Sequence, residues 1–408
     1  MLADNIHLLA KIIASGQRLQ VLRVFEWDPK QEIILLSKIP LNHLKFRIVR
    51  YIQLTWIFII MYQCFFLEIP KGDIERGYLV SKGFQGFFFI ANSMFVVQFH
   101  MIAAHGSKLV LYINGHLQFH RLYQKGKHKI EMKERNIIEK FTLLLAHMIY
   151  WTCHICPFTV AYGNHWMNPC MATCVGYWLL DECNVGFKEE DYGMWNLIAK
   201  IILLSLNYYV MYASVAICCF AFAIVFSLSV LSIRDALRTF CEHNLNKIEI
   251  GNSAVMYRHV QLLASLLNII QQNSSVLIYT HWCVFFFGVL LYMILRLSWT
   301  MDNAFALITF TLALLDVYVI IIAGVTCLAS IHSESEDVYK KLETNYCSVL
   351  KRNGSRSKFE LRWRRKFYNS FRAIKMKVGP TNFVEVGTPL VLLDAGIGIT
   401  VDLLLLDV

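Results

Sequence analysis

Residues 388 to 408, the last stretch of the chain, read TPLVLLDAGIGITVDLLLLDV, and this apolar run decides the fold. Twenty-one residues at about 1.5 Å each cross the roughly 30 Å hydrocarbon layer of a bilayer, which predicts a membrane-spanning helix. A carboxylate near the bilayer centre costs about 3 kcal/mol, so acids in this run are expected to face protein or water. Such a span suggests a path for cations beside Asp394, Asp402 and Asp407.

The composition of the whole chain is that of a membrane protein. Hydrophobic residues make up 56% of the 408 residues and charged residues only 17%, and the polar stretches between apolar runs are short. One polytopic domain is therefore expected, without a cleavable signal peptide, so that the first span is its own targeting signal. The net charge of +10 lies in loops beside apolar runs, where membrane topology explains it better than nucleic-acid binding does.

Hydropathy predicts seven transmembrane helices and hence an all-α, multi-pass membrane protein. Its expected location is the plasma membrane. Lys and Arg number 32 in the segments on one side and 5 on the other, which predicts a cytoplasmic N-terminus and an extracellular C-terminus. A G-protein-coupled receptor would need the opposite orientation, and a transporter would be expected to show repeated halves. The predicted spans are 51–67, 83–104, 138–162, 197–231, 276–295, 303–330 and 388–408.

The spans divide the chain into four parts: a cytoplasmic segment (1–50), helices one to six (51–330), a cytoplasmic loop (331–387) and the terminal helix (388–408). Apolar residues at steps of three and four predict amphipathic helices on the inner side at 253–272 and 359–377. The second is dense in Lys and Arg. It suits either an interfacial helix on anionic lipid or a helix that packs with neighbouring subunits below the membrane.

Seven spans, an inner N-terminus, a long sixth-loop helix and a terminal span together resemble the insect gustatory and odorant receptor superfamily. The tail adds to the resemblance through Phe371-Arg-Ala-Ile-Lys-Met-Lys-Val-Gly, Asn382-Phe and Thr388. The superfamily ends in Thr-Tyr, five mostly apolar residues and Gln. Here Thr400 holds the Thr place, whereas Val401 and Asp407 depart from Tyr and Gln, as in a divergent gustatory-type receptor.

The resemblance implies a ligand-gated, non-selective cation channel opened by a small organic molecule. It implies a homo- or hetero-tetramer of related receptor subunits in the lipid bilayer, with the last span of each subunit lining a central pore. A small-molecule ligand pocket is implied among the outer halves of spans two to six. Phosphate loops, nucleophile elbows and metalloprotease helices are absent from the sequence, so no enzyme and no cofactor are predicted.

Two faces of the terminal helix are candidates for the pore. Gly396, Thr400, Leu404 and Asp407 recur at steps of four, four and three and share one face. On that face Leu404 would be the hydrophobic constriction and Asp407 an acidic ring at the outer mouth. The opposite face, with Asp394, Gly398 and Asp402, would be buried against spans five and six, or would line the path if the helix were rotated. The glycines suit close helix packing as well as a pore.

The outer halves of the spans carry aromatic residues with a few polar atoms, the lining that a small organic ligand needs. The same residues suit a membrane-protein core or an interfacial aromatic belt. Asp316, deeper in span six, is a functional candidate because intramembrane carboxylates are costly. The candidate pocket residues are Phe88, Asn92, Tyr150, Trp151, His154, Tyr208, Tyr209, Tyr212, Phe305, Thr309 and Asp316.

A cluster of cysteines near the third span has spacings that would suit zinc in a cytosolic protein: Cys153, Cys156, Cys170 and Cys174, with His154 and His165 among them. The predicted topology puts this cluster at the outer face, where oxidation favours disulfides. A disulfide among Cys170, Cys174 and Cys183 is therefore predicted in preference to a metal site.

Overall fold

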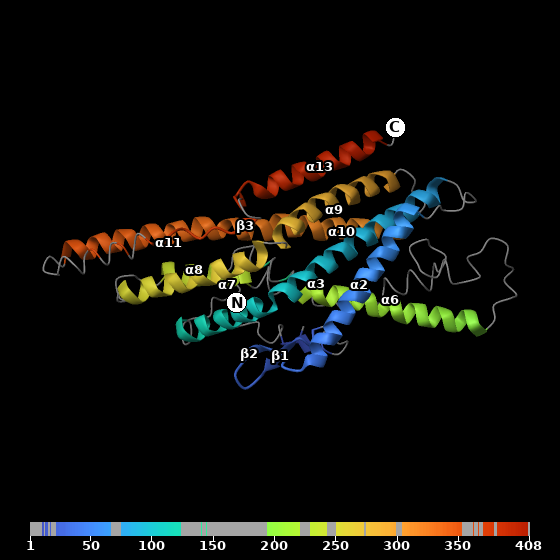
Figure 1. Ribbon diagram of the computed structural model, residues 1–408. Coiled ribbons are helices and arrows are strands. Elements are labelled where there is room, and N and C mark those ends of the chain that lie inside the picture. Colours follow the sequence, from blue (N-terminus) through green and yellow to red (C-terminus); the bar gives the residue numbers. More distant parts are fainter. Residues whose placement is uncertain are drawn as a thin grey trace.

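The chain folds into long helices that lie alongside one another in an elongated bundle (Figure 1). The computed structural model describes residues 22–66, 75–123, 194–220, 229–242, 250–272, 275–298, 304–352, 370–378 and 382–406, with a few single residues between them. The predicted all-α class is confirmed. The helices are α2 (Pro40–Phe66), α3 (Glu75–Tyr123), α6 (Met194–Phe220), α7 (Ser229–Glu242), α8 (Ile250–Gln272), α9 (Ser275–Ser298), α10 (Ala304–Val319), α11 (Val325–Arg352) and α13 (Thr388–Leu406).

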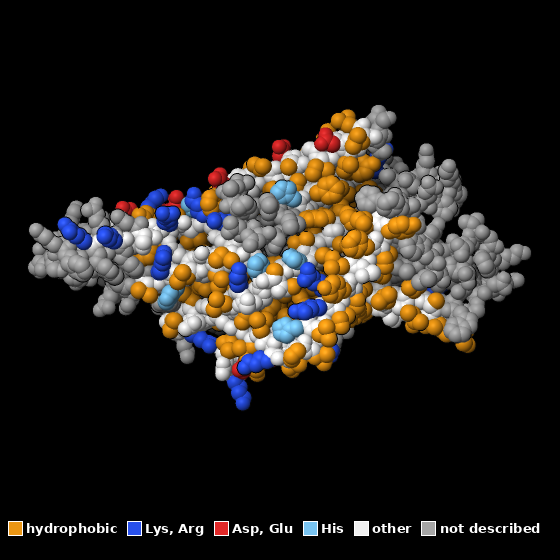
Figure 2. Space-filling model, viewed as in Figure 1, with side chains coloured by type: hydrophobic (Ala, Val, Ile, Leu, Met, Phe, Trp, Pro, Cys, Tyr) orange, Lys and Arg blue, Asp and Glu red, His pale blue; other side chains and the backbone are white. Residues whose placement is uncertain are grey.

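Four described stretches are long and apolar enough to cross a membrane: Asn92–Leu122, Leu197–Ser214, Phe310–Thr344 and Thr388–Leu406. They indicate a multi-pass membrane protein. Hydrophobic side chains cover the half of the molecule around α9 and α2, whereas Lys and Arg side chains gather over the half that holds α8, α11 and the N-terminal strands (Figure 2). The count of seven spans and the side of each terminus stay predictions. Of the third predicted span, 138–162, the structure describes only residues 140 and 144.

The sixth predicted span is the beginning of a much longer helical rod. Helix α10 continues through a π-helical turn, η5 (Ile320–Gly324), into α11. Exposed side chains change along the rod from Ile308, Leu312 and Leu315 on α10 to charged groups on α11. The apolar part suits lipid and the charged part suits water, so the rod joins the two halves of the molecule.

Two hydrophobic cores hold the bundle together. One joins α2, α6, α9 and α10 around Trp56, Phe286 and Phe310. The other joins α3, α7, α8 and α11 around Tyr112 and Tyr257, and it belongs to the half that carries most of the exposed charge. Helix α3 contributes to both cores, and it runs through most of the length of the bundle (Figure 1).

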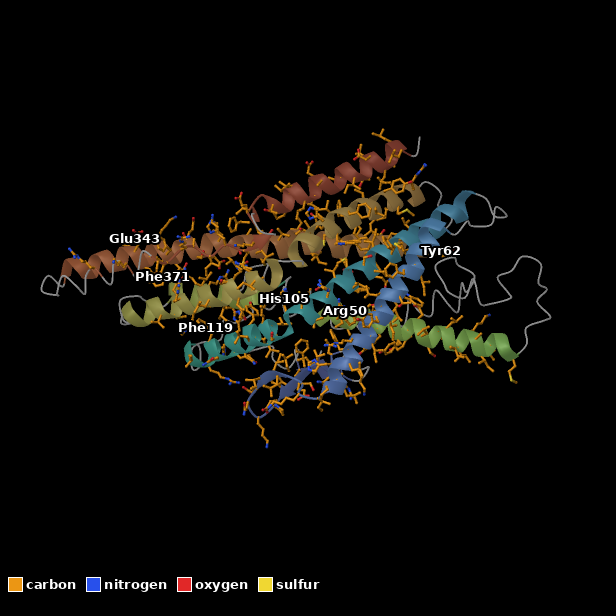
Figure 3. The ribbon with its side chains drawn as sticks, viewed as in Figure 1. Arg50, Tyr62, His105, Phe119, Glu343 and Phe371 are labelled. Carbon is orange, nitrogen blue, oxygen red and sulfur yellow. The ribbon has the colours of Figure 1, made fainter. Side chains whose placement is uncertain are left out.

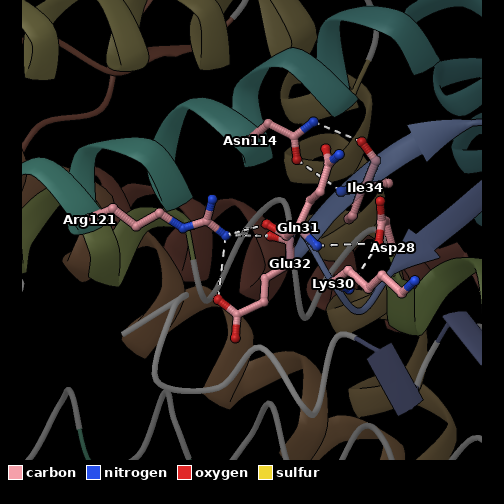
Figure 4. A network of polar contacts seen from close by, with 7 residues as sticks. All are labelled: Asp28, Lys30, Gln31, Glu32, Ile34, Asn114 and Arg121. Atoms are coloured by element: carbon pink, nitrogen blue, oxygen red, sulfur yellow. Dashed lines mark hydrogen bonds and ion pairs between the residues drawn. The ribbon is translucent and has the colours of Figure 1, made fainter.

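A β-hairpin precedes α2, in the segment for which the sequence predicts only a cytoplasmic location. Strands β1 (Phe25–Asp28) and β2 (Ile33–Leu36) pair antiparallel. Asn114 of α3 accepts a hydrogen bond from the Ile34 amide (2.9 Å) and donates one to its carbonyl (2.7 Å), as a neighbouring strand would. Arg121 donates to the carbonyls of Gln31 (2.6 Å) and Glu32 (3.0 Å) in the turn (Figure 4). The hairpin is therefore fixed to α3 at both its edge and its turn.

Candidate functional site

The terminal helix α13 packs along α9 through a crossing of two glycines. A Cβ atom on Gly288 of α9 would lie 2.8 Å from the carbonyl oxygen of Gly396, and one on Gly396 would lie 2.7 Å from the Phe287 ring. The Thr400 hydroxyl lies 3.1 Å from the carbonyl oxygens of both Gly288 and Gly396. Small residues and a hydroxyl bond are the usual means by which apolar helices approach closely in a membrane.

Replacing Gly288 with alanine is expected to separate the two helices, because the contact it would meet is rigid backbone on α13. Overpacking of this kind costs about 1–3 kcal/mol, and the Thr400 hydrogen bond would be lost as well. The melting temperature of the detergent-purified protein should fall. Gly398→Ala is the matched control, since nothing lies within 4 Å of a Cβ atom there. Equal melting temperatures for both variants would contradict the close crossing.

The two faces of α13 have opposite environments in the folded chain. Gly396 and Thr400, on the first candidate pore face, are buried against α9, and Leu404 is half-buried. Asp394, Gly398 and Asp402, on the other face, are exposed, and acidic side chains lie along the free side of α13 (Figure 2). The small residues of the first face thus serve helix packing within the chain. The exposed acidic face corresponds to the rotated alternative, and Asp407 lies outside the described residues.

A short extended segment, residues 371–378, joins the charged half of the molecule to the chain that leads into α13. The predicted helix to Lys377 is wrong over this part: Phe371–Met376 is irregular, and β3 (Lys377–Val378) pairs with β4 (Asn382–Phe383). The reason is that side chains of other helices bind its backbone. Asn268 of α8 donates to the Lys375 carbonyl (2.9 Å) and accepts from the Lys377 amide (2.9 Å). An amide side chain that binds backbone on both sides holds the segment extended.

Three further side chains hold the same segment. Tyr257 and Gln261 of α8 donate to the Arg372 carbonyl, at 3.0 and 2.6 Å, and Ser335 of α11 accepts from the Ile374 amide at 2.8 Å. Burial raises the pKa of the Tyr257 hydroxyl, which therefore stays a neutral donor. The position of the chain entering α13 is thus set by both α8 and α11. The sequence gives no sign of these roles, because Asn, Gln and Ser on amphipathic helices normally face water.

An ion pair links α7 to α11. The Arg234 Nε and Nη2 atoms lie 3.0 and 2.5 Å from Oε1 of Glu334, and Arg238 Nη2 lies 3.9 Å from the same oxygen. The side chain of Arg234 is only 4% exposed and that of Glu334 is 23% exposed. A largely buried guanidinium needs its carboxylate, so this pair fixes the two helices relative to each other.

The predicted ligand pocket is only partly described. Asn92 of α3 and Tyr212 of α6 are buried, and the rings of Tyr208 and Tyr212 lie 6.1 Å apart with Tyr209 between them in sequence. Asp316 is exposed on α10. Phe88 lies on α3, and Phe305 and Thr309 lie on α10, but the structure does not describe their side chains. Six further candidates lie outside the described residues: Tyr150, Trp151, His154, Cys170, Cys174 and Cys183. No group of three metal-binding side chains occurs among the described residues.

A buried polar contact between α2 and α6 was not expected from the sequence. Gln53 donates to the Val210 carbonyl (2.7 Å) and accepts from the Ser214 hydroxyl (2.8 Å). Both side chains are almost fully buried, at 1% and 0% exposure. A glutamine that alternates with apolar residues in a span is a recognisable signal of such a contact, since it is costly without a partner.

No protein-family model matches the chain, and no curated protein matches it by sequence. Among solved structures, the fold is similar to that of the insect olfactory receptor OR5 from Machilis hrabei, determined in complex with eugenol. The TM-score is 0.58, and the match covers 99% of this chain and 100% of that chain at 10% identity. The chain therefore shares the fold of this insect olfactory receptor, as the resemblance noted in the sequence led us to expect.

Proposed function

We propose that this chain, which has the fold of an insect olfactory receptor, is a chemosensory receptor of the plasma membrane that acts as a ligand-gated, non-selective cation channel. The observation that carries this proposal is the terminal helix α13. Only 17% of the apolar stretch of this helix is buried against the rest of the chain. Its exposed face carries Asp394 and Asp402. Against lipid, each carboxylate would cost about 3 kcal/mol. A water-filled path between several copies of α13 removes that cost.

The arrangement of α13 supports the acidic face as the lining of the path. Gly396 and Thr400 are engaged with α9, so the first candidate face would have to leave that contact before it could meet water. In a homo- or hetero-tetramer, the exposed faces of four terminal helices would surround the axis, and their aspartates would attract cations. Leu404 and Asp407 keep their proposed places as constriction and outer ring only if the helix rotates on opening.

A small organic molecule is the ligand class that the fold supports. The solved receptor with this fold is in complex with eugenol. In this chain, the described part of the predicted pocket offers Asn92 and Tyr212, an amide and a phenol on neighbouring helices α3 and α6. An apolar site with a few polar groups binds such a molecule by shape and by one or two hydrogen bonds.

The proposal predicts cation currents in cells that express the full chain and are exposed to a panel of small volatile compounds, beginning with eugenol. Deleting Val401–Val408 is expected to abolish the current, because it shortens a helix that barely spans the hydrocarbon layer. Surface labelling of an N-terminally tagged protein, before and after permeabilisation, would control for membrane delivery and report the orientation. Normal currents after the deletion would exclude α13 as the lining of the path.

A further inference from the structure

A cavity of about 510 Å³ lies between the N-terminal hairpin, the first half of α2 and the middle of α3. Its polar side chains are His43, Arg47, Arg50 and Tyr51 of α2 and Ser107 of α3, and its lining includes no Asp or Glu. Phe46, from the same turn of α2 as Arg47, is 4% exposed and forms an apolar wall. Neither the channel path nor the predicted ligand pocket involves this cavity. It is large enough for a small molecule and too large for a bare ion.

The two arginines of this cavity have hydrogen-bonding capacity that the subunit does not use. Arg47 is exposed and makes no hydrogen bond or ion pair with the described residues. Arg50 donates from Nη2 to Nδ1 of His100 at 2.9 Å, while its Nε atom is buried without a partner among the described residues. A buried N–H without an acceptor is costly, and an anion in the cavity would supply one.

The walls of the cavity are held in place without a ligand. His43 Nε2 is 2.7 Å from the Ser37 carbonyl oxygen, which fixes the ring and makes this nitrogen the donor. Asn114 and Arg121 fix the hairpin to α3 (Figure 4). A Cβ atom on Gly106 of α3 would lie 3.8 Å from the Leu36 side chain and 4.0 Å from the Phe25 ring, so the hairpin lies close to α3 there. A site built on such supported elements needs little reorganisation to bind.

The cavity also lies where the predicted topology meets the inner surface of the membrane. Arg47 and Arg50 come just before the first predicted span, which begins at Tyr51, and Ser107 comes just after the second, which ends at Ala104. The exposed Tyr51 ring is the kind of side chain that sits at the level of lipid head groups. Anionic lipids are concentrated in the cytoplasmic leaflet, and Arg at that level is attracted to them.

We propose that this cavity binds a phosphate group, presented either by the head group of an anionic lipid in the inner leaflet or by a soluble phosphorylated molecule. Guanidinium groups recognise phosphate by paired, charge-assisted hydrogen bonds. Two guanidinium groups and a serine hydroxyl can donate to a phosphate from more than one side. Arg47, Arg50 and Ser107 are the ligands of the phosphate. The apolar wall at Phe46 accommodates the adjoining carbon atoms.

The experiment measures binding of defined probes to the full-length protein in phosphatidylcholine nanodiscs. The probes are dioctanoyl phosphatidylinositol bisphosphate, the soluble head group inositol trisphosphate and, as an uncharged-head-group reference, dioctanoyl phosphatidylcholine. Binding of a phosphorylated probe is expected to weaken by about tenfold or more in Arg47→Gln/Arg50→Gln, as for loss of two charge-assisted contacts. Lys45→Gln is the matched control, because Lys45 lies on the same helix but does not line the cavity.

The two sources of phosphate give different results. Saturable binding of the dioctanoyl phosphoinositide without binding of inositol trisphosphate assigns the site to lipid, and comparable binding of both assigns it to a soluble ligand.

Ser107→Asp adds a carboxylate at an exposed position and should also weaken binding of the phosphorylated probes. This variant tests the site if the arginine variant fails to fold. No saturable binding of either probe, or binding that neither variant weakens, would overturn the proposal.

Discussion

Replacing Glu334 with alanine is expected to destabilise the subunit by about 3–5 kcal/mol, the usual cost of removing one partner from a buried ion pair. The change leaves the guanidinium of Arg234, only 4% exposed, without the carboxylate oxygen that both its Nε and Nη2 atoms contact. Arg238, which approaches the same oxygen, would lose its partner there as well. Thermal unfolding of the purified protein measures the loss, and channel currents should disappear with it.

Two further variants distinguish the loss of stability caused by breaking the ion pair from that caused by removing any acidic residue of α11. Glu343 is exposed on the same helix and makes no hydrogen bond or ion pair with the described residues (Figure 3), so Glu343→Ala should be nearly neutral. Arg234→Met/Glu334→Leu removes both charges and fills their space, and it should cost less than Glu334→Ala alone. If the double variant is the less stable of the two, the guanidinium does not depend on this carboxylate.

Replacing Asp394 and Asp402 together with asparagine is expected to reduce cation selectivity of the evoked current. An exposed carboxylate beside a permeating cation contributes about 1 kcal/mol, which corresponds to roughly a fivefold change in relative permeability. The effect should be larger for calcium than for sodium, because the interaction scales with the charge of the ion. Reversal potentials in solutions of different calcium content measure it.

Asp337→Asn provides the comparison for this pair, because Asp337 is an exposed carboxylate on α11 rather than on α13. Its selectivity should match that of the unmodified chain. Unchanged reversal potentials in the α13 variant, with currents of normal size, would exclude the exposed face as the lining. A selectivity change on replacing Asp407 alone would then favour the first candidate face.

The helical architecture is predictable from the sequence because it depends on hydropathy over long windows. Thr388–Leu406 and Leu197–Ser214 fall within predicted spans, and α8 begins at Ile250 and ends at Gln272, close to its predicted bounds. Such patterns depend on many residues at once, so a single unusual side chain does not hide them. The aspartates of the terminal span are likewise visible in the sequence, and they set it apart from the other predicted spans.

The environment of single side chains was not predictable in the same way. Helical periodicity puts Gly396 and Thr400 on one face and Asp402 on the other, but it cannot say which face meets α9. That choice depends on the partner glycine, Gly288, 108 positions earlier in the chain. The two short hairpins cannot be predicted from local sequence for a related reason. Their strands are fixed by Asn114 and Asn268, side chains of distant helices that replace the hydrogen bonds of a wider sheet.

The π-helical turn at Ile320–Gly324 makes the number of residues in the rod as important as their types. A π turn is equivalent to one residue inserted into an α-helix, and each residue of an α-helix advances the direction of the side chain by about 100°. Adding or removing one residue between Asp316 and Glu334 would turn α11 by that angle relative to α10. Glu334 would then point away from Arg234. Substitutions in this stretch are expected to be tolerated far better than single-residue insertions or deletions.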